Sequence, residues 1–508
     1  MPFRRRPDRD ADAHWAQVSE LIAERMGLHF PRERLPDLQR GLETAGDELG
    51  FENVTACADW LLSAPPTKAQ LQVLASHLTI GETYFLREKQ TFEVLSTSVL
   101  PALIHARRGR DQRLRLWSAA CCSGEEAYSL AILLHQLLPD LADWHVTILA
   151  TDINARFLRR AVAGSYSEWS FRDTPAGFKE RYFNRSEDKR YAIRPEIKKL
   201  VTFEHLNLVE DVYPSLVTDP NAMDLIFCRN VLMYFTSVQA RKVIGNLHHA
   251  LIDGGWLAVS PSETSQALFP QFLTQNFPGV VLYQKSDAEF RAHSARTPMP
   301  RRAAEQLVAP AAVVPLPPPT TSAQASEPPP APEAETLISV GPTPPPAVAA
   351  SLYEQGRYDE AAEALLASFA NDSPEPRSFS LLARALANQG RLADALAWCE
   401  RWIAADKLDA VAHFVRAAVL LEHGRLDQAR RSLQRVLYLD PNVVLAHFAL
   451  GNLARSRGKD DEAEKHFANA LRLLDGLQPD DVLLEADGLT AGRLTATITA
   501  MTALESAR

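Results

Sequence analysis

The sequence predicts an all-α N-terminal domain, an α/β domain with a parallel sheet, a proline-rich linker and an all-α repeat array. Three observations predict this order: strands alternate with helices in the second quarter of the chain, prolines concentrate in one stretch, and glycines recur at a fixed spacing near the C-terminus. With 508 residues, of which 46% are apolar and 23% charged, the chain is long enough to build several packed cores.

The N-terminal part, residues 12–95, is predicted to be helical. Apolar residues recur there at the spacing of one helix face, as in Trp15, Val18, Leu21 and Ile22, and again in Leu71, Leu74, Ala75 and Leu78. We therefore expect a small helical domain before the sheet.

From about residue 114 the pattern changes to that of a Rossmann-like α/β domain, which we place at 96–290. The predicted strands are Leu114–Ser118, His145–Thr151, Ala222–Cys228 and Trp256–Ser260. Helices are predicted over Glu125–Leu138 and 238–252, the latter stopping at Gly254-Gly255. Alternation of this kind predicts a parallel sheet covered on both faces, with ligands beyond the carboxyl ends of the strands.

A linker follows at 291–343. Fifteen of the 34 prolines lie between Pro298 and Pro346, among Ala, Ser, Thr and Val. This composition cannot bury a core and predicts a disordered, extended tether between the flanking domains.

Beyond the linker a 34-residue period resembles the tetratricopeptide repeat (TPR). Glycine recurs at Gly356, Gly390, Gly424 and Gly458, with Ala five residues later and a large or apolar residue nine residues later each time. Glycine would end the first helix of each pair in a left-handed turn, and Ala would allow the second helix to approach closely. We predict about four units over 344–480, with a tail or capping helix at 481–508. Cys399 falls on a core position of this pattern.

Composition excludes several classes of protein. The net charge of -9 argues against a nucleic-acid partner, and the five cysteines are too few for a disulfide framework, which favours the cytoplasm. The sequence contains no apolar run of membrane-spanning length, so we expect no membrane insertion. We predict no metal site.

The predicted strand ends carry the polar residues of a candidate ligand site. The first strand leads through a small-residue loop into a helix that starts with Glu125 and Glu126, and the second ends at Asp152. Two carboxylates at a helix start suit a cationic ligand and repel phosphate, although they also serve as ordinary helix caps. Asp152 is placed to bind a ribose, or else to form a turn. A ligand with a ribose, a positive charge and no phosphate is S-adenosylmethionine.

The third strand end, Arg229-Asn230, lies where methyltransferases place the acceptor group. The alternative is that these two residues only form hydrogen bonds within the loop. Several short motifs then occur in order: Thr79–Glu88, Trp117–Ala120 with Ser123–Glu126, Ala150–Ile153, Leu206–Leu208, and Ile226–Val231 with Tyr234–Phe235. The ordered set resembles the chemoreceptor glutamate methyltransferase (CheR) family over roughly residues 12–285. Members with a C-terminal TPR domain are similar to this chain overall.

The resemblance implies roles for individual residues. The positions that match cofactor contacts are Gly81, Thr83, Arg87, Glu126, Asp152, Asn207, Leu208, Arg229 and Asn230. Arg87 and Tyr234 match the residues that line the place of methyl transfer, and we expect them to be catalytic. Asp152 would bind the ribose and Glu126 would face the cationic methionine end.

The implied reaction is methyl transfer from S-adenosylmethionine to a glutamate γ-carboxylate, leaving S-adenosylhomocysteine. The carboxylate is already ionised at pH 7, so no general base is needed, and the positive and negative charges neutralise each other in the transition state. The implied substrate is the cytoplasmic helical region of chemoreceptors. A different class of function stays open: a scaffold that binds S-adenosylmethionine through this fold but turns over weakly or not at all.

Four features depart from the family pattern. Gly81 replaces the usual Asn, and Ser260-Pro261 replaces Gly-His. The segment Arg181–Leu208 is about three residues shorter than in members that grip a receptor's C-terminal pentapeptide, so we expect a pentapeptide-independent enzyme. In many members of the family the second N-terminal helix is rich in Arg and contacts the acidic receptor helix. Here Arg32, Arg34 and Arg40 are present, but acidic residues follow them, which predicts either a weaker or different receptor-binding surface or an ordinary solvated helix face.

The repeat array is expected to form a concave groove for an unknown protein partner. In the register of the glycines, the inner-face positions include Ser380, Arg384, Phe414, Phe448 and Asn452. This predicts a mostly apolar groove, although the two phenylalanines fit a core position equally well. We expect a docking or regulatory role, with the linker acting as a flexible tether.

Overall fold

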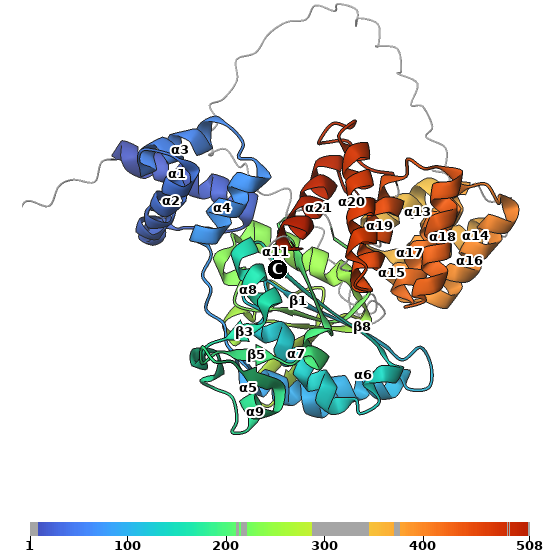
Figure 1. Cartoon of the computed structure of the whole chain (residues 1–508), viewed down its shortest axis with the longest axis horizontal. Coiled ribbons are helices and arrows are strands. Elements are labelled where there is room, and N and C mark those ends of the chain that lie inside the picture. Colours follow the sequence, from blue (N-terminus) through green and yellow to red (C-terminus); the bar gives the residue numbers. More distant parts are fainter. Residues whose placement is uncertain are drawn as a thin grey trace, which may run out of the picture.

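The computed structural model describes residues 9–505 apart from 210–212, 215–220, 287–344, 370–375, 485 and 487. A helical N-terminal domain, a sheet domain and a helical C-terminal array follow one another along the chain, as the sequence predicts (Figure 1). The predicted linker at 291–343 lies outside the described residues.

Four helices form the N-terminal domain: α1 (Arg9–Met26), α2 (Leu35–Leu49), α3 (Val54–Ser63) and α4 (Lys68–Leu78). Their apolar faces meet in one cluster that includes Val18, Leu38 and Leu74, each fully buried. Local sequence sets the helix boundaries. Gly50 ends α2 in a left-handed turn, and Thr67 with Gln70 makes the capping box that starts α4.

A seven-stranded sheet in the order β6-β2-β1-β7-β8-β10-β9 is the centre of the second domain. Its strands are β1 (Arg113–Ala119), β2 (His145–Asp152), β6 (Val201–His205), β7 (Met223–Cys228), β8 (Leu251–Ala258), β9 (Leu273–Phe277) and β10 (Val280–Gln284). β6, β2, β1, β7 and β8 are parallel, whereas β10 pairs antiparallel with both β8 and β9. The order reverses at β1, so the carboxyl ends of β1, β2 and β7 meet at a switch point.

Helices pack on both faces of the sheet, as predicted. Those that contact its strands are α5 (Lys89–Val94), α6 (Leu100–Arg107), α7 (Glu125–Leu137), α8 (Ala155–Ala163) and α11 (Ser237–Ala250). The short helices α9 (Phe178–Tyr182) and α10 (Pro195–Lys198) pack instead against a second, smaller sheet and against α7, respectively. Alternation along β1 sends Leu116 into the core with α6 and α7, and Trp117 into the core with α11. The expectation that α11 stops at Gly254-Gly255 is wrong. The helix ends at Ala250 and both glycines lie within β8, where Gly255 comes so close to the Met223 carbonyl that a Cβ would lie 3.0 Å from it.

A second, antiparallel sheet of three short strands lies between β2 and β6 in the sequence. Its order is β3 (Ser165–Tyr166), β5 (Tyr191–Ile193) and β4 (Phe183–Arg185). Phe85 joins this subdomain to the segment before α5, because its ring stacks on Phe171 and packs edge-on against Phe183.

The C-terminal array consists of stacked helix pairs. The helices are α13 (Pro345–Glu354), α14 (Tyr358–Phe369), α15 (Pro376–Asn388), α16 (Leu392–Ala405), α17 (Ala410–Glu422), α18 (Leu426–Leu439), α19 (Val444–Ser456), α20 (Asp460–Leu474) and α21 (Ala491–Glu505). All four repeat glycines have positive φ, between 67° and 75°, and all four repeat alanines are at most 1% exposed. Cys399 is fully buried in this core, and burial raises its pKa to about 12. The sequence-derived reason for the period is therefore confirmed.

Three of the residues expected to line an apolar groove on the inner face of the array are buried. Ser380, Phe414 and Phe448 are each 5% exposed or less, and the two phenylalanines pack in a core cluster between helices. Of the two positions that the sequence allows for these phenylalanines, the core position is confirmed, and Ser380 is buried as well.

The array contacts the sheet domain at the amino ends of the strands. Cβ atoms built on Gly356 and Gly424 would lie within 3 Å of the rings of His249 and His145, respectively. Glu422, at the end of α17, is 6% exposed and pairs through Oε2 with both Arg113 and Arg115 of β1. The repeats are therefore packed against the sheet through their intra-repeat turns.

Candidate functional site

The predicted site residues gather around a cleft beyond the carboxyl ends of β1, β2 and β7. The cleft consists of a larger cavity of about 290 Å³ and a smaller cavity of about 80 Å³. Ile80, Ala120, Cys122, Asn230 and Tyr234 line both cavities, so the two are continuous.

The structure distributes the predicted residues between the two ends of the cleft. Thr83, Arg87, Glu126 and Arg229 line the larger cavity, whereas Asp152, Asn207 and Leu208 line the smaller one. Asn230 and Tyr234 lie at the junction. The predicted ribose-binding carboxylate and the predicted carboxylate for a cation are thus at opposite ends of one elongated site.

Gly81 is the one predicted residue that lines neither cavity. A Cβ at this position would lie 2.6 Å from the ring of Phe157, which itself lines the smaller cavity. The ring occupies the space that an Asn side chain at position 81 would need. Glycine at this position and Phe157 on α8 are therefore sterically compatible with each other, whereas Asn and Phe157 are not. The lost polar contact is replaced by an apolar wall.

Asp152 ends β2 with its carboxylate buried against backbone amides. Its Oδ2 accepts a hydrogen bond from the amide of Cys122 (2.9 Å) and its Oδ1 from the amide of Asn154 (2.8 Å). Each oxygen keeps a second lone pair, which suits a diol. Burial raises the pKa of Asp152 to about 6, although the two amides act in the opposite direction.

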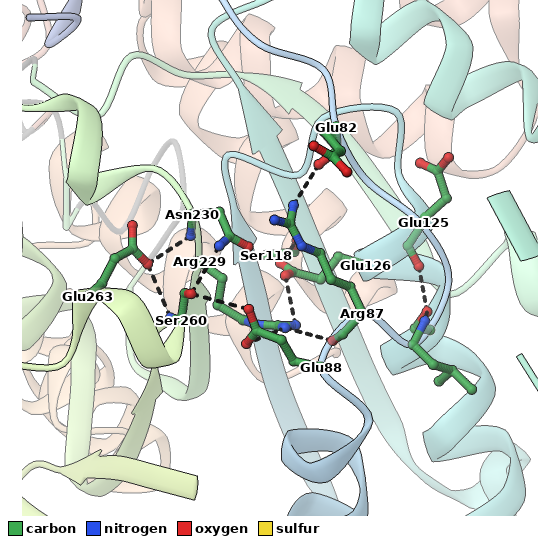
Figure 2. Close-up of polar contacts among 12 residues, drawn as sticks. Glu82, Arg87, Glu88, Ser118, Glu125, Glu126, Arg229, Asn230, Ser260 and Glu263 are labelled. Carbon is green, nitrogen blue, oxygen red and sulfur yellow. Dashed lines mark hydrogen bonds and ion pairs between the residues drawn. The ribbon is translucent and has the colours of Figure 1, made fainter. Parts of the chain in front are cut away.

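Glu126 and its neighbours form the polar end of the larger cavity (Figure 2). Ser118 Oγ donates to Glu126 Oε1 (2.7 Å), and Arg229 Nη1 lies 3.3 Å from Oε2. Burial raises the pKa of Glu126 more than Arg229 lowers it. A cation bound here would therefore meet a carboxylate whose charge is incompletely balanced by the protein.

Glu125, by contrast, does not line the cleft. It accepts hydrogen bonds from Ser123 (2.7 Å) and from Ser170 (3.0 Å) of η4 (Glu168–Phe171), and it is 3% exposed. Of the two adjacent carboxylates, one fixes the small-sheet subdomain to α7 and the other faces the ligand site.

Arg229 is a buried support beneath the cleft. Its Nη2 lies 2.7 Å from Glu88 Oε2 and donates to the carbonyl of Arg87 (2.6 Å). Glu88 also accepts a hydrogen bond from Ser260 (3.2 Å), so the strand ends of β7 and β8 are tied to the segment before α5. The guanidinium of Arg87 extends from this segment and donates to the Glu82 carbonyl (2.6 Å), as Figure 2 shows.

The site suits S-adenosylmethionine on the chemistry of its donors. A carboxylate with spare acceptor capacity lies at the smaller end, a partly balanced carboxylate lies at the larger end, and apolar side chains such as Leu28, Phe157 and Phe235 line the space around the smaller end. Asp152, Asn207 and Leu208 would hold the nucleoside, and Glu126 with Asn230 would face the methionine part.

Comparison with known proteins agrees with this geometry. The CheR methyltransferase, SAM binding domain, matches residues 81–275, and tetratricopeptide repeats match 349–410 and 414–480. Chemotaxis protein methyltransferase 1 of Pseudomonas aeruginosa is 37% identical over 220 residues, which are 42% of this chain and 77% of that protein. Chemotaxis protein methyltransferase 2 of Vibrio cholerae is 32% identical over 228 residues, 45% of this chain and 75% of that protein.

The chain belongs to the CheR methyltransferase family. It combines the S-adenosylmethionine-binding domain of that family with C-terminal TPR repeats. In the described part of this methyltransferase, no helix combines the length and the apolar character that crossing a bilayer requires.

Sequence reasoning missed the contribution of the N-terminal domain to the cofactor cleft. Met26, the last residue of α1, and Leu28, in the loop that follows it, line the smaller cavity. The loop is held there because His29 N donates to the carbonyl of Tyr234 (2.7 Å) and Asn207 Nδ2 donates to the carbonyl of Arg25 (2.7 Å). No motif marks this loop, since its role depends on how two domains pack.

Glu263 is a second residue that the motifs did not single out. It lies in η6 (Pro261–Glu263), is 6% exposed, and its carboxylate accepts from the amides of Asn230 (2.7 Å), Val231 (2.8 Å), Met233 (3.2 Å) and Ser260 (3.1 Å). These bonds hold the loop that carries Asn230, whose φ is 58°, and Tyr234. The departure Ser260-Pro261 leaves this arrangement intact, because the capping box needs only Ser260 and Glu263.

The expectation that Arg32, Arg34 and Arg40 share the second N-terminal helix is wrong for the first two, which lie in a separate turn, η1 (Arg32–Arg34), just before α2. Arg34 and Arg40 both pair with Asp37, and Arg34 also lies over the ring of Tyr234 at 5.7 Å. Arg34 therefore supports the wall of the cleft.

Proposed function

We propose that this methyltransferase transfers a methyl group from S-adenosylmethionine to glutamate side chains in the cytoplasmic helices of chemoreceptors, forming γ-methyl esters and releasing S-adenosylhomocysteine. The observation that carries the proposal is the position of Arg87 and Tyr234. Both line the larger cavity, which also contains Glu126, so a carboxylate entering there would meet a cationic side chain beside the cofactor's methionine end.

The residues supply positioning and a water-poor environment. S-adenosylmethionine supplies an electrophilic methyl group on a sulfonium. Arg87 would hold the acceptor carboxylate, and the Tyr234 hydroxyl would orient it by donating a hydrogen bond. Because the acceptor loses its negative charge during the reaction, Arg87 must bind it weakly enough not to stabilise the starting state. Its bond to the Glu82 carbonyl gives the guanidinium a competing partner, which moderates that affinity.

We also propose that recognition does not need a receptor's C-terminal pentapeptide and that the reaction takes place in the cytoplasm. The support for the first point is the small size of the three-stranded sheet, whose β4 and β5 are three residues each. The repeat array would bind a protein partner and serve docking or regulation. Its packing on the strand ends opposite the cleft leaves the ligand site open while the array is in place.

The test is transfer of tritium from labelled S-adenosylmethionine to receptor-rich membranes. Methyl esters release methanol in base, whereas N-methyl groups do not, so base-labile label is the expected result. Arg87→Ala and Tyr234→Phe should lower the rate strongly while S-adenosylhomocysteine binding persists for Tyr234→Phe. Binding of S-adenosylhomocysteine by the wild type without any labelling of the membranes would favour a cofactor-binding scaffold instead.

A further inference from the structure

Three large apolar side chains are exposed around the mouth of the larger cavity. Ile80 is 55% exposed, Met233 57% and Trp169 70%. Ile80 and Met233 line the cavity directly. They come from three separate segments: the loop after α4, η5 (Leu232–Tyr234) and η4. Hereafter these three residues are called the apolar rim.

Trp169 is joined to the cavity through a stack of side chains. The guanidinium of Arg172 lies 4.6 Å from the ring centre of Trp169 and 3.8 Å from that of Tyr84, which lines the cavity. Arg172 also pairs with Glu82 (3.4 Å), another lining residue. Trp169 is thus fixed in place beside the entrance, with a cation between it and the cavity.

Exposed apolar residues that occur singly need no explanation, but a group that surrounds a cavity indicates a binding surface. In the described part of the first two domains, the other large apolar side chains with comparable exposure are Leu62 and Val238, and neither lines the cleft. Apolar exposure is therefore concentrated where the acceptor must enter.

The chemistry of the rim selects the kind of acceptor. A small carboxylic acid would find its partners inside the cavity and would leave the exposed surfaces of the rim side chains in contact with water. A glutamate on a helix carries neighbours three and four residues away on the same face, and these would lie over the rim while the carboxylate reaches Arg87. Arg172, whose guanidinium is paired with Glu82, contributes the flat surface on which Trp169 packs.

We propose that the apolar rim, with Arg172, is the docking surface for an amphipathic acceptor helix whose reactive glutamate is flanked on the same face by apolar side chains. The inference rests on the proposed function and deepens it, because it assigns substrate selection to Trp169 and Met233 rather than to the catalytic residues. Burial of the rim would supply binding free energy without contact with the reacting atoms.

The experiment measures base-labile tritium transfer to receptor-rich membranes by the full-length protein. Trp169→Ser and Met233→Ser are compared with Leu408→Ser, which alters a side chain on the repeat array that is as exposed as Trp169, at 70%. We expect each rim variant to lower kcat/KM for the membranes about tenfold, mainly through KM, because a rim side chain contributes binding and not chemistry. Trp169→Phe should restore most of the loss, and Leu408→Ser should behave as wild type.

Calorimetry with S-adenosylhomocysteine separates this inference from the proposed function. Trp169→Ser should bind the by-product as tightly as wild type, since Trp169 lines neither cavity. If the wild-type protein labels the membranes and both rim variants label them with unchanged kcat/KM, the proposed docking surface is wrong, whereas the proposed methyltransferase function is supported. If the wild-type protein does not label the membranes, the proposed function is wrong, and the docking proposal that rests on it is wrong as well. Concentration-dependent dimerisation that Trp169→Ser abolishes would make the rim a contact between copies, which also overturns the proposal.

Discussion

The two edges of the central sheet both contain buried charged side chains, yet they use them differently. At the amino edge, Arg113 and Arg115 share the carboxylate of Glu422 from the repeat array, and all three residues are 6% exposed or less. At the carboxyl edge, Asp152 is surrounded by backbone amides and cavity, with no cation among its hydrogen-bond partners described above. The amino edge pairs its buried cations with a carboxylate from the same chain. The carboxyl edge presents a carboxylate to which a ligand can donate hydrogen bonds.

Burial shifts the pKa against the charged form at both edges, and the edges differ in which groups oppose that shift. Burial raises the pKa of Asp152 to about 6 and raises that of Glu126, which means that the protein alone does not fully stabilise these carboxylates. Burial also lowers the pKa of Arg113, and Glu422 opposes that shift. The comparison teaches that a functional edge is recognised by charge that the fold has buried without a full partner, whereas charge paired between domains serves assembly.

The largest expected effect is at the amino edge. Glu422→Gln would remove the buried carboxylate that Arg113 and Arg115 share, which should weaken the contact between array and sheet by about 3–5 kcal/mol. Hydrogen exchange along β1 in a urea series would measure this loss, and affinity for S-adenosylhomocysteine should stay near the wild-type value.

The matched control is Glu400→Gln, which removes an exposed partner of Arg416 on the same array and should cost less than about 1 kcal/mol. Equal exchange rates in the two variants would show that the pairing at the amino edge does not hold the domains together.

The next effect is at the carboxyl edge. Asp152→Asn should weaken binding of S-adenosylhomocysteine by about 2–3 kcal/mol, roughly 30–150-fold in Kd, because an amide NH2 would replace an acceptor oxygen facing the ribose. Calorimetry checks this, with the exposed Asp143→Asn as control. A variant that binds as wild type would move the ribose elsewhere in the cleft.

A smaller effect is expected at the loop that carries Asn230 and Tyr234. Glu263→Gln keeps the size of the side chain but turns an NH2 toward amides that now donate to a carboxylate. We expect kcat for methyl transfer to fall about tenfold, with a much smaller change in S-adenosylhomocysteine affinity, because the residue positions the acceptor side of the cleft. An equal loss in both quantities would mean that Glu263 merely holds the fold together.

The smallest effect is a pH dependence of cofactor binding. Asp152 must be ionised to accept hydrogen bonds from both ribose hydroxyls, and its pKa of about 6 means that protonation competes as the pH falls. Affinity for S-adenosylhomocysteine should be constant above pH 7 and roughly tenfold weaker at pH 5. Calorimetry across this range measures the profile, and the Asp152→Asn profile should be flat. A wild-type profile without this fall would show that the group is fully ionised throughout.

Much of the candidate site was predictable from the sequence because parallel strands bring their carboxyl ends together. Asp152 and Asn230 are 78 positions apart in the numbering, yet both follow apolar strands and both line the cleft. The smaller antiparallel strands β9 and β10 and the role of Glu263 were not predicted. Short strands lack a distinctive period, and a buried carboxylate that accepts from backbone amides has no sequence signature beyond its own identity.

By itself the sequence determined the order of the domains, the phase of the repeats and the chemistry of the strand ends. These properties depend on local periodicity, on glycine's tolerance of positive φ and on the types of side chain at fixed places. Only the tertiary structure decided that Phe157 fills the space beside Gly81, that the loop after α1 closes the cofactor cleft, and that Glu422 packs onto β1. Each depends on contacts between residues far apart in the chain, where close packing and the pairing of buried charge select one arrangement.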